Sequence, residues 1–241
     1  MPDSIDLAEH GIRLFICRLF NHDYLWFSSY EVSKVSSTYP VIHNYALSYS
    51  LADFSYGIYR GSTPRYEEDL PGFPLYATPA YREEYDKSRL TYNAVNSLTL
   101  RTDDAPRGIN SPGIGWRVYL NPAWGKEDRS KSSFTCYVFT FDGSVPRGVT
   151  RLGKKGTAVR VIWEEITAPQ AVFRNKAIRP AHPVNPLDIT GQVDKYDPIM
   201  IPPHMLFRTA EIKGDWFCLK KEHRVHIPER VMKRVFGGQD K

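Results

Sequence analysis

The residues best suited to chemistry lie in a basic stretch near the middle of the chain, RGVTRLGKKGTAVR. It has no acidic residue and five basic ones, which are Arg147, Arg151, Lys154, Lys155 and Arg160. Glycines at a turn let the backbone approach a ligand closely, and exposed amide groups beside lysines can hold phosphates. The GxxxxGK[ST] spacing of a nucleotide-binding P-loop is absent. The alternative is a four-residue hairpin turn whose lysines serve only solubility.

A second candidate is the segment HNYALSY, which begins with His43, Asn44 and Tyr45. Histidine titrates near neutrality, so together with a tyrosine and a lysine it could act as a general acid or base on an RNA 2′-hydroxyl. No second catalytic group stands at a diagnostic spacing. We therefore expect these residues to tie down neighbouring loops or to contact RNA or DNA without catalysis.

A third candidate is the polar region 85–132, which has few apolar residues of its own. Aromatic and basic side chains are interleaved in it, together with two asparagines: Tyr92, Asn93, Asn96, Arg101, Arg107, Trp116, Arg117, Lys126, Arg129 and Lys131. This pattern predicts a hairpin arm that lies on another molecule. Single-stranded nucleic acid suits such side chains, and docking on a neighbouring subunit is an equal alternative.

The remaining titratable residues predict no further site. The acidic groups EEDL (67–70) and REEYD (82–86) have basic neighbours in proline-rich loops, so we expect them to be solvated. Four histidines are scattered and lack the partners of a standard metal site: His182, His204, His223 and His226. We expect neither a metal nor another cofactor.

The bulk composition is that of an ordinary soluble globular protein. The chain has 241 residues, of which 41% are hydrophobic and 13% aromatic, and its formal charge is +5. A mildly basic chain only weakly suggests a polyanionic partner. Its cysteines, Cys17, Cys136 and Cys218, stand in apolar runs and are expected to be reduced core residues. The polar first residues and the lack of a long apolar run predict a cytoplasmic protein without a membrane partner.

The elements that must position these residues are mostly strands. Alternating apolar residues predict strands over 11–20, 23–29, 89–102, 116–124, 134–143, 184–189 and 211–221, and a hairpin pair on either side of the two lysines. Helical spacing predicts a helix over 39–54, with Pro40 at its start, and a short basic helix over 228–236. Residues 59–81 should be irregular. The order predicts an α+β sandwich with helices on one face of an antiparallel sheet.

Five motifs follow one another along the chain: YPVIHNYALSYSLADFSYGIY, TPRYEEDL, LYATPA, RLTYNAVNSLTLR and VTRLGKKGTAVRV. Over about 11–235 the chain thereby resembles the Cas-five-type (Csc family) subunit of type I-D CRISPR surveillance (Cascade) complexes, in the repeat-associated RNA-binding superfamily. HNYALSY and RLGK are the most specific parts of the likeness. The resemblance implies one domain with a ferredoxin-like (RRM-like) core, an inserted β-hairpin thumb at about 85–132, and flexible tails at 1–10 and 236–241.

The resemblance also implies a function in antiviral defence. Such a subunit binds the 5′ handle of the guide crRNA without catalysis, caps the backbone filament, touches the large subunit and lies near target DNA at the protospacer-adjacent motif. The superfamily's glycine-rich loop matches Gly153–Gly156 best. Expected RNA contacts are Arg147, Arg151, Lys154, Lys155 and Arg160, with Tyr92, Asn93, Asn96, Arg101 and Arg107 on the thumb.

Two alternatives stay open at this point. Some related subunits of another CRISPR subtype cut precursor RNA without metal, and here His43, Tyr45 and Lys154 would be the residues for that reaction. The chain could also be a scaffold whose basic surface meets only acidic neighbouring proteins.

Overall fold

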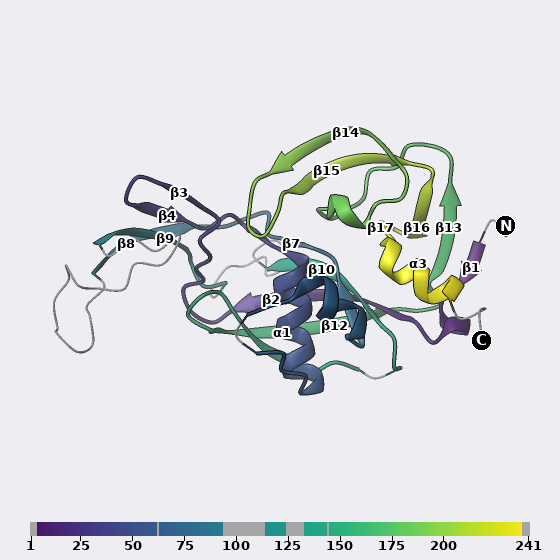
Figure 1. Cartoon of the computed structure of the whole chain (residues 1–241), viewed down its shortest axis with the longest axis horizontal. Coiled ribbons are helices and arrows are strands. Elements are labelled where there is room, and N and C mark those ends of the chain that lie inside the picture. The colour runs from purple at the N-terminus through teal and green to yellow at the C-terminus, as the bar shows by residue number, and fades with distance from the viewer. Residues whose placement is uncertain (1–3, 62, 94–113, 124–132, 144, 238–241) are drawn as a thin grey trace.

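The computed structural model describes residues 4–61, 63–93, 114–123, 133–143 and 145–237. The fold is mixed α/β, with one antiparallel sheet at its centre. This central sheet contains β2 (Arg13–Asn21), β5 (Val41–Ile42), β6 (Leu75–Ala77), β7 (Ala80–Tyr81), β10 (Phe134–Thr140), β11 (Val149–Leu152) and β12 (Thr157–Ile166). The strands run in the order β11-β12-β2-β10-β7-β5, and β6 also pairs with β10 (Figure 1). The predicted strands at 11–20 and 134–143 and the hairpin around the lysines are confirmed.

Side chains of β2 alternate between two hydrophobic clusters, as expected for a strand in the middle of a sheet. Cys17 and Leu19 join the cluster on one face, whereas Leu14 and Ile16 join the cluster on the other. Both faces of this sheet are therefore apolar, and both require cover from other elements.

Helix α1 (Asn44–Tyr56) covers the first face, with Leu47 and Leu51 in the same cluster as Cys17 and Leu19 (Figure 1). The helix begins later than the sequence predicted. His43 has extended backbone angles and its Nδ1 accepts the N–H of Tyr45, so it caps the helix instead of lying in it. The residues before it form β5, which pairs with β7.

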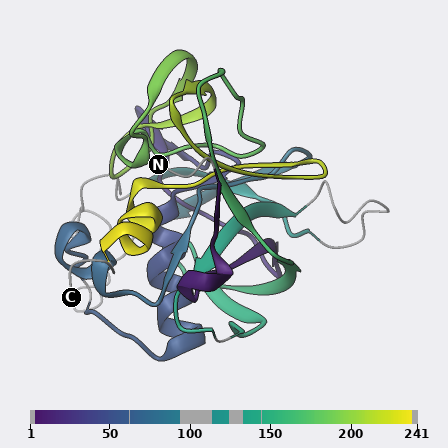
Figure 2. The same ribbon diagram turned by 90° about the vertical axis from the view of Figure 1, so that its right-hand side faces the viewer.

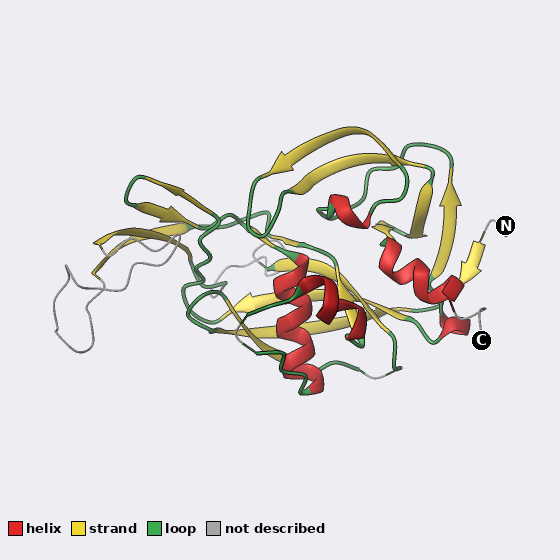
Figure 3. Ribbon diagram, in the orientation of Figure 1, coloured by secondary structure: helices red, strands yellow, loops and turns green. Residues whose placement is uncertain are grey.

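A second sheet and a helix cover the other face. This C-terminal sheet contains β1 (Ser4–Asp6), β13 (Gln170–Arg174), β16 (Asp215–Lys220) and β17 (His223–His226), in the order β1-β13-β16-β17. Helix α3 (Glu229–Phe236) places Val231, Met232 and Val235 against the cluster that holds Leu14 and Ile16. The helix at 228–236 is thus confirmed, but the prediction that helices lie on one face is wrong, because both faces are apolar (Figure 3).

A four-stranded sheet projects from the core and is named the arm here (Figure 1, left). It consists of β3 (Tyr30–Val32), β4 (Val35–Ser37), β9 (Ile114–Leu120) and β8 (Lys87–Asn93), in this order. Strands β8 and β9 are antiparallel, while β4 and β9 are parallel. The strand predicted at 89–102 is confirmed as far as Asn93, and the rest of it lies outside the described residues.

The remaining elements are short or exposed. Within 59–81 there is one four-residue helix, α2 (Tyr66–Asp69), followed by a 3-10 turn over Leu70–Gly72. Strands β14 (Gln192–Ile199) and β15 (Leu206–Lys213) form a ribbon above the core (Figure 2). The strand predicted at 184–189 is wrong apart from a single bridge at Val184: Asn185 accepts the N–H of Leu187 and starts a 3-10 turn. Gly214, with φ +72°, divides 211–221 between two strands.

Candidate nucleic-acid interface

The turn between β11 and β12 is held in one conformation by its glycines. Gly153 and Gly156 have φ values of +77° and +62°. A Cβ atom on Gly153 would lie 2.8 Å from the carbonyl oxygen of Trp26. The N–H of Lys154 donates to that same carbonyl at 3.0 Å. The turn is therefore docked on the segment before the arm, and it presents Lys154 and Lys155 from a fixed position.

Three cations surround two aromatic rings beside this turn. The ammonium of Lys154 lies 5.3 Å from the ring centre of Trp26, and that of Lys155 lies 5.7 Å from the ring centre of Tyr119. The guanidinium of Arg117 lies 4.2 Å from the Trp26 ring. We call these five residues the turn cluster. Its two rings are almost fully buried, whereas both lysines are exposed.

Lys154 and Lys155 keep their positive charge in these contacts. Cation–π contacts orient an ammonium group but leave its charge in place. Among the described residues, no carboxylate forms an ion pair with Lys154 or Lys155. Two adjacent ammonium groups of this kind suit the phosphates of a nucleic-acid backbone.

Two of the predicted arginines lie on a different surface, which we call the open face: Arg18, Phe20, Arg151, Arg160 and Ile162. Arg160 is opposite Phe20 and Ile162 is opposite Arg18 across β12 and β2, so these four share one side of the sheet. It is the side away from α1, because the alternate residues of β12 belong to the α1 cluster. The side chains of Arg18 and Ile162 are 42% and 47% exposed.

Arg151 connects the two surfaces, whereas Arg147 lies apart from both. The guanidinium of Arg151 donates to the carbonyl of Gly156 at 2.9 Å, so it reaches back to the turn. Arg147 donates its N–H to Ser55 of α1, and its carbonyl accepts from the indole of Trp163. Ser50, also on α1, donates to the carbonyl of Arg151 at 2.7 Å. The basic stretch is thus divided between three places.

Only part of the predicted thumb can be placed. Tyr92 and Asn93 end strand β8, opposite Gly115 and Ile114. The other thumb candidates lie outside the described residues: Asn96, Arg101, Arg107, Lys126, Arg129 and Lys131. Trp116 on β9 is 41% exposed, and the guanidinium of Arg89 lies 5.3 Å from its ring centre. The described part of the arm therefore presents an aromatic side chain and a cation together.

His43, Asn44 and Tyr45 are buried where α1 begins. Burial lowers the pKa of His43 to about 3, and its Nδ1 is already occupied as the helix cap. Asn44 donates to the hydroxyl of Tyr76 at 2.9 Å, and the same hydroxyl donates to the buried carboxylate of Asp188. These contacts hold α1, β6 and the turn at 186–188 together.

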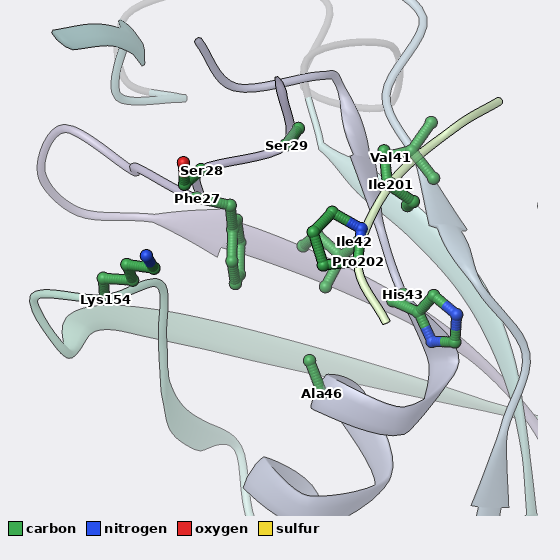
Figure 4. Close-up of a pocket in the computed structure, with 10 residues that line it drawn as sticks. All are labelled: Phe27, Ser28, Ser29, Val41, Ile42, His43, Ala46, Lys154, Ile201 and Pro202. Carbon is green, nitrogen blue, oxygen red and sulfur yellow. The ribbon is translucent and has the colours of Figure 1, made fainter. Parts of the chain in front are cut away.

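A small pocket of about 170 Å³ lies between α1, the turn and the loop after β14. Figure 4 shows the rings of Phe27 and Pro202 on opposite sides, with Ala46 below them. Its lining consists of Phe27, Ser28, Ser29, Val41, Ile42, His43, Ala46, Lys154, Ile201 and Pro202. The pocket therefore adjoins the turn cluster through Lys154.

The acidic segments are less solvated than the sequence predicted. Glu67, Glu68, Glu83 and Glu84 are exposed, as expected. Asp69, however, is buried and accepts the hydroxyl of Tyr49 at 2.7 Å.

Arg82 has no exposed surface at all, which also contradicts the prediction. Its guanidinium donates to the side chain of Asn21 at 3.3 Å and to the carbonyls of Asn121 and Glu84 at 3.0 and 2.9 Å. Because Asn21 ends β2 and Asn121 directly follows β9, this arginine fastens the arm to the core.

The scattered histidines belong to the C-terminal part of the core. His226 pairs with Asp215 at 2.9 Å, and both side chains are almost fully buried. The N–H of His226 donates to His182, which is buried as well. Throughout the described ranges, no three side chains of His, Cys, Asp or Glu gather as metal ligands would.

Acid is expected to destabilise the fold through two buried histidines. Burial lowers the pKa of both His43 and His182 to about 3, whereas an unfolded histidine titrates near 6.5. The unfolded chain takes up these protons first, so the free energy of unfolding falls as the pH drops from about 6.5 towards 3. Each imidazole adds a slope approaching about 1.4 kcal/mol per pH unit.

His43→Asn isolates one of these two contributions, because asparagine is also a good helix cap. Urea unfolding between about pH 4.5 and 7 should show a pH slope smaller by nearly one proton. A slope equal to that of the unaltered chain would contradict this assignment.

None of the helices among the described residues has the length and apolar composition that a bilayer crossing requires.

Comparison with known proteins identifies one family. The family described as type I-D CRISPR-associated protein Cas5/Csc1 matches residues 12–235. No curated protein matches the sequence. One solved structure that is similar to this chain belongs to the type III-B Cmr-beta complex bound to cognate target RNA and AMPPnP. It is 12% identical with a TM-score of 0.43, and the match covers 94% of this chain and 90% of the other.

Proposed function

Because the chain belongs to the type I-D CRISPR-associated Cas5/Csc1 family, we propose that it is a non-catalytic subunit that binds the 5′ handle of the guide crRNA. In this role it caps the backbone filament of a type I-D surveillance complex and contacts the large and backbone subunits. Target DNA near the protospacer-adjacent motif passes close to it. Base pairing with the guide reads the target sequence, while the protein reads phosphates and shape.

The observation that carries this proposal is the turn cluster. Lys154 and Lys155 are exposed, adjacent and held on buried rings, with no acidic partner among the described residues. A scaffold that meets acidic proteins would need only scattered surface charge. A fixed pair of ammonium groups beside aromatic rings better suits the phosphates of single-stranded RNA. Arg151 and Arg160 extend the basic surface over the open face, and Arg147 adds a cation at the sheet edge.

The strand order supports a ferredoxin-like core for this subunit. Strand β2, helix α1, strand β6, strand β10 and strand β12 follow one another along the chain, and they lie in the order β12-β2-β10-β6 in the sheet. The ferredoxin-like motif has the chain order β-α-β-β-α-β, and here strand β11 stands between β10 and β12, where that motif has its second helix. The β8–β9 hairpin lies in the region 85–132 that we assign to the thumb.

The properties of His43 favour a non-catalytic role. A general base works best when its pKa is near the operating pH and its nitrogen is free to take a proton. The imidazole of His43 is buried, its pKa is lowered to about 3, and its Nδ1 accepts the N–H of Tyr45. The hydroxyl of Tyr45 is also poorly suited to proton transfer near neutral pH, because burial raises its pKa.

Purification of the complex through a tag on this chain tests the proposal. The co-purified RNA is sequenced from its 5′ end, and the proteins are identified by mass spectrometry. We expect RNAs that share one repeat-derived 5′ sequence, together with the large and backbone subunits. RNA with heterogeneous 5′ ends, or a protein complex without RNA, would refute handle binding. Crosslinking followed by peptide mapping should place residues 151–160 on the RNA.

A further inference from the structure

The pocket beside Lys154 is separate from the exposed ammonium groups that suit phosphates. Its volume of about 170 Å³ is below the roughly 300 Å³ at which pockets for drug-sized ligands begin. It can therefore hold one ring system but not a whole nucleotide cofactor. Its walls come from four parts of the chain that are distant in sequence: residues 27–29, residues 41–46 at β5 and the start of α1, Lys154 in the turn, and the loop after β14.

The walls of the pocket suit a flat, largely apolar group. The rings of Phe27 and Pro202 lie on opposite sides of it, and the methyl group of Ala46 lies below (Figure 4). Phe27 is partly exposed and Pro202 is exposed, so both rings are accessible. The hydroxyl of Ser29 accepts the N–H of Tyr39 at 3.0 Å, which leaves its own proton available to a hydrogen-bond acceptor.

Lys154 places a positive charge beside the pocket. Lys154 is one of the lining residues, and its ammonium lies 5.3 Å from the ring centre of Trp26 in the turn cluster. The apolar walls suit a flat, apolar group inside the pocket, and the ammonium suits an anionic group just outside it. A nucleotide within a strand has this form, because its base is a stacking ring and its phosphate carries the charge.

We infer that this pocket takes one unstacked nucleobase of the RNA strand whose phosphate lies on Lys154. The inference rests on the proposed function and adds a position-specific contact to it. Single-stranded RNA is commonly recognised in this way, with bases turned out of the stack and placed against aromatic side chains. The base stacks on Phe27, and Ser29 donates to an acceptor at its edge.

The first test needs only the unaltered protein and a set of synthetic handle RNAs. Each RNA has one abasic site, and the site moves along the handle one nucleotide at a time. Removal of a stacked base typically weakens binding by one to two orders of magnitude. We expect a single handle position, next to the phosphate bound by Lys154, at which the abasic site removes this stack. At that position alone, RNA binding should weaken by about tenfold. Equal affinity for every abasic RNA would overturn the inference.

The second test fills the pocket. Ala46→Leu places three more carbon atoms on the pocket side of α1 and keeps a good helix former. It should weaken binding of the intact handle by about tenfold, and the abasic site at the sensitive position should then have no further effect. The control Ala177→Leu makes the same change at an exposed residue away from the pocket and should leave the affinity unchanged.

The outcomes separate this inference from the proposed function. If Ala46→Leu weakens intact and abasic RNA equally, the pocket does not hold a base. If Ala46→Leu binds RNA normally but no longer joins the complex, the pocket holds a side chain of a neighbouring protein, and the inference fails. In either case binding that still depends on Lys154 and Lys155 leaves the proposed function standing.

Discussion

Replacing Lys154 and Lys155 by alanine together should weaken binding of the crRNA handle by roughly tenfold at 0.15 M salt and about 45-fold at 0.05 M. Each phosphate contact to a single strand contributes about 0.7 to the slope of log affinity against log salt concentration. Loss of both contacts should therefore lower that slope by about 1.4 units. Because cation–π contacts leave both charges available, the full electrostatic effect is expected. Fluorescence anisotropy across a salt series measures it.

The control for this experiment removes the same charge elsewhere. Lys176→Ala combined with Lys213→Ala takes two exposed lysines from the region of β13 and β15, away from the turn cluster. This variant should keep the salt slope of the unaltered chain. An equal loss in both double variants would show that net charge, and not the turn cluster, attracts the RNA. An unchanged slope in the Lys154 and Lys155 variant would remove the turn from the interface.

Asp215→Asn should lower the free energy of unfolding by about 3 kcal/mol, because each buried donor left without its acceptor costs about 1 to 3 kcal/mol. The carboxylate is buried beside His226, and hydrogen bonds with this imidazole and with Thr190 hold its pKa below the usual range despite burial. It also accepts the N–H groups of Gly191 and Trp216. An amide has one oxygen for these donors and turns two protons of its own towards them.

Urea or thermal unfolding measures this loss of stability. For a chain of this size the midpoint should fall by roughly 10 °C. Asp194→Asn makes the same substitution at an exposed position of β14 and should shift stability by less than about 0.5 kcal/mol. A similar shift in the two variants would show that the buried contacts of Asp215 do not stabilise the core.

Local patterns were enough to predict the strands that hold the basic turn. Alternation in FICRLF and FTCYVFTF marks β2 and β10, and two glycines mark the turn between β11 and β12. The start of α1 was misplaced because β5 exists only through its pairing with β7, about 40 residues further along the chain. Such pairing overrides local helical spacing. The 3-10 turn at 186–188 was missed for a different and local reason, since Asn185 accepts the N–H of Leu187 and caps it.

The candidate site was predictable only in part. Lys154 and Lys155 were found from glycine spacing, but their aromatic partners Trp26 and Tyr119 lie 128 and 36 residues away in the sequence. Nothing near the lysines signals those rings. The division of the arginines follows from strand alternation, because Arg151 and Arg160 point away from α1. The burial of Arg82 could not be foreseen, since its hydrogen-bond acceptors come from the ends of two distant strands.

The hydroxyl of Ser50 has a consequence for how many copies of this chain can associate. Strand β11 is the last strand of the central sheet, and an unpaired strand at a sheet edge is a template for adding another chain. Ser50 occupies the carbonyl of Arg151 on that strand. This closes one route by which a second copy could join through strand pairing.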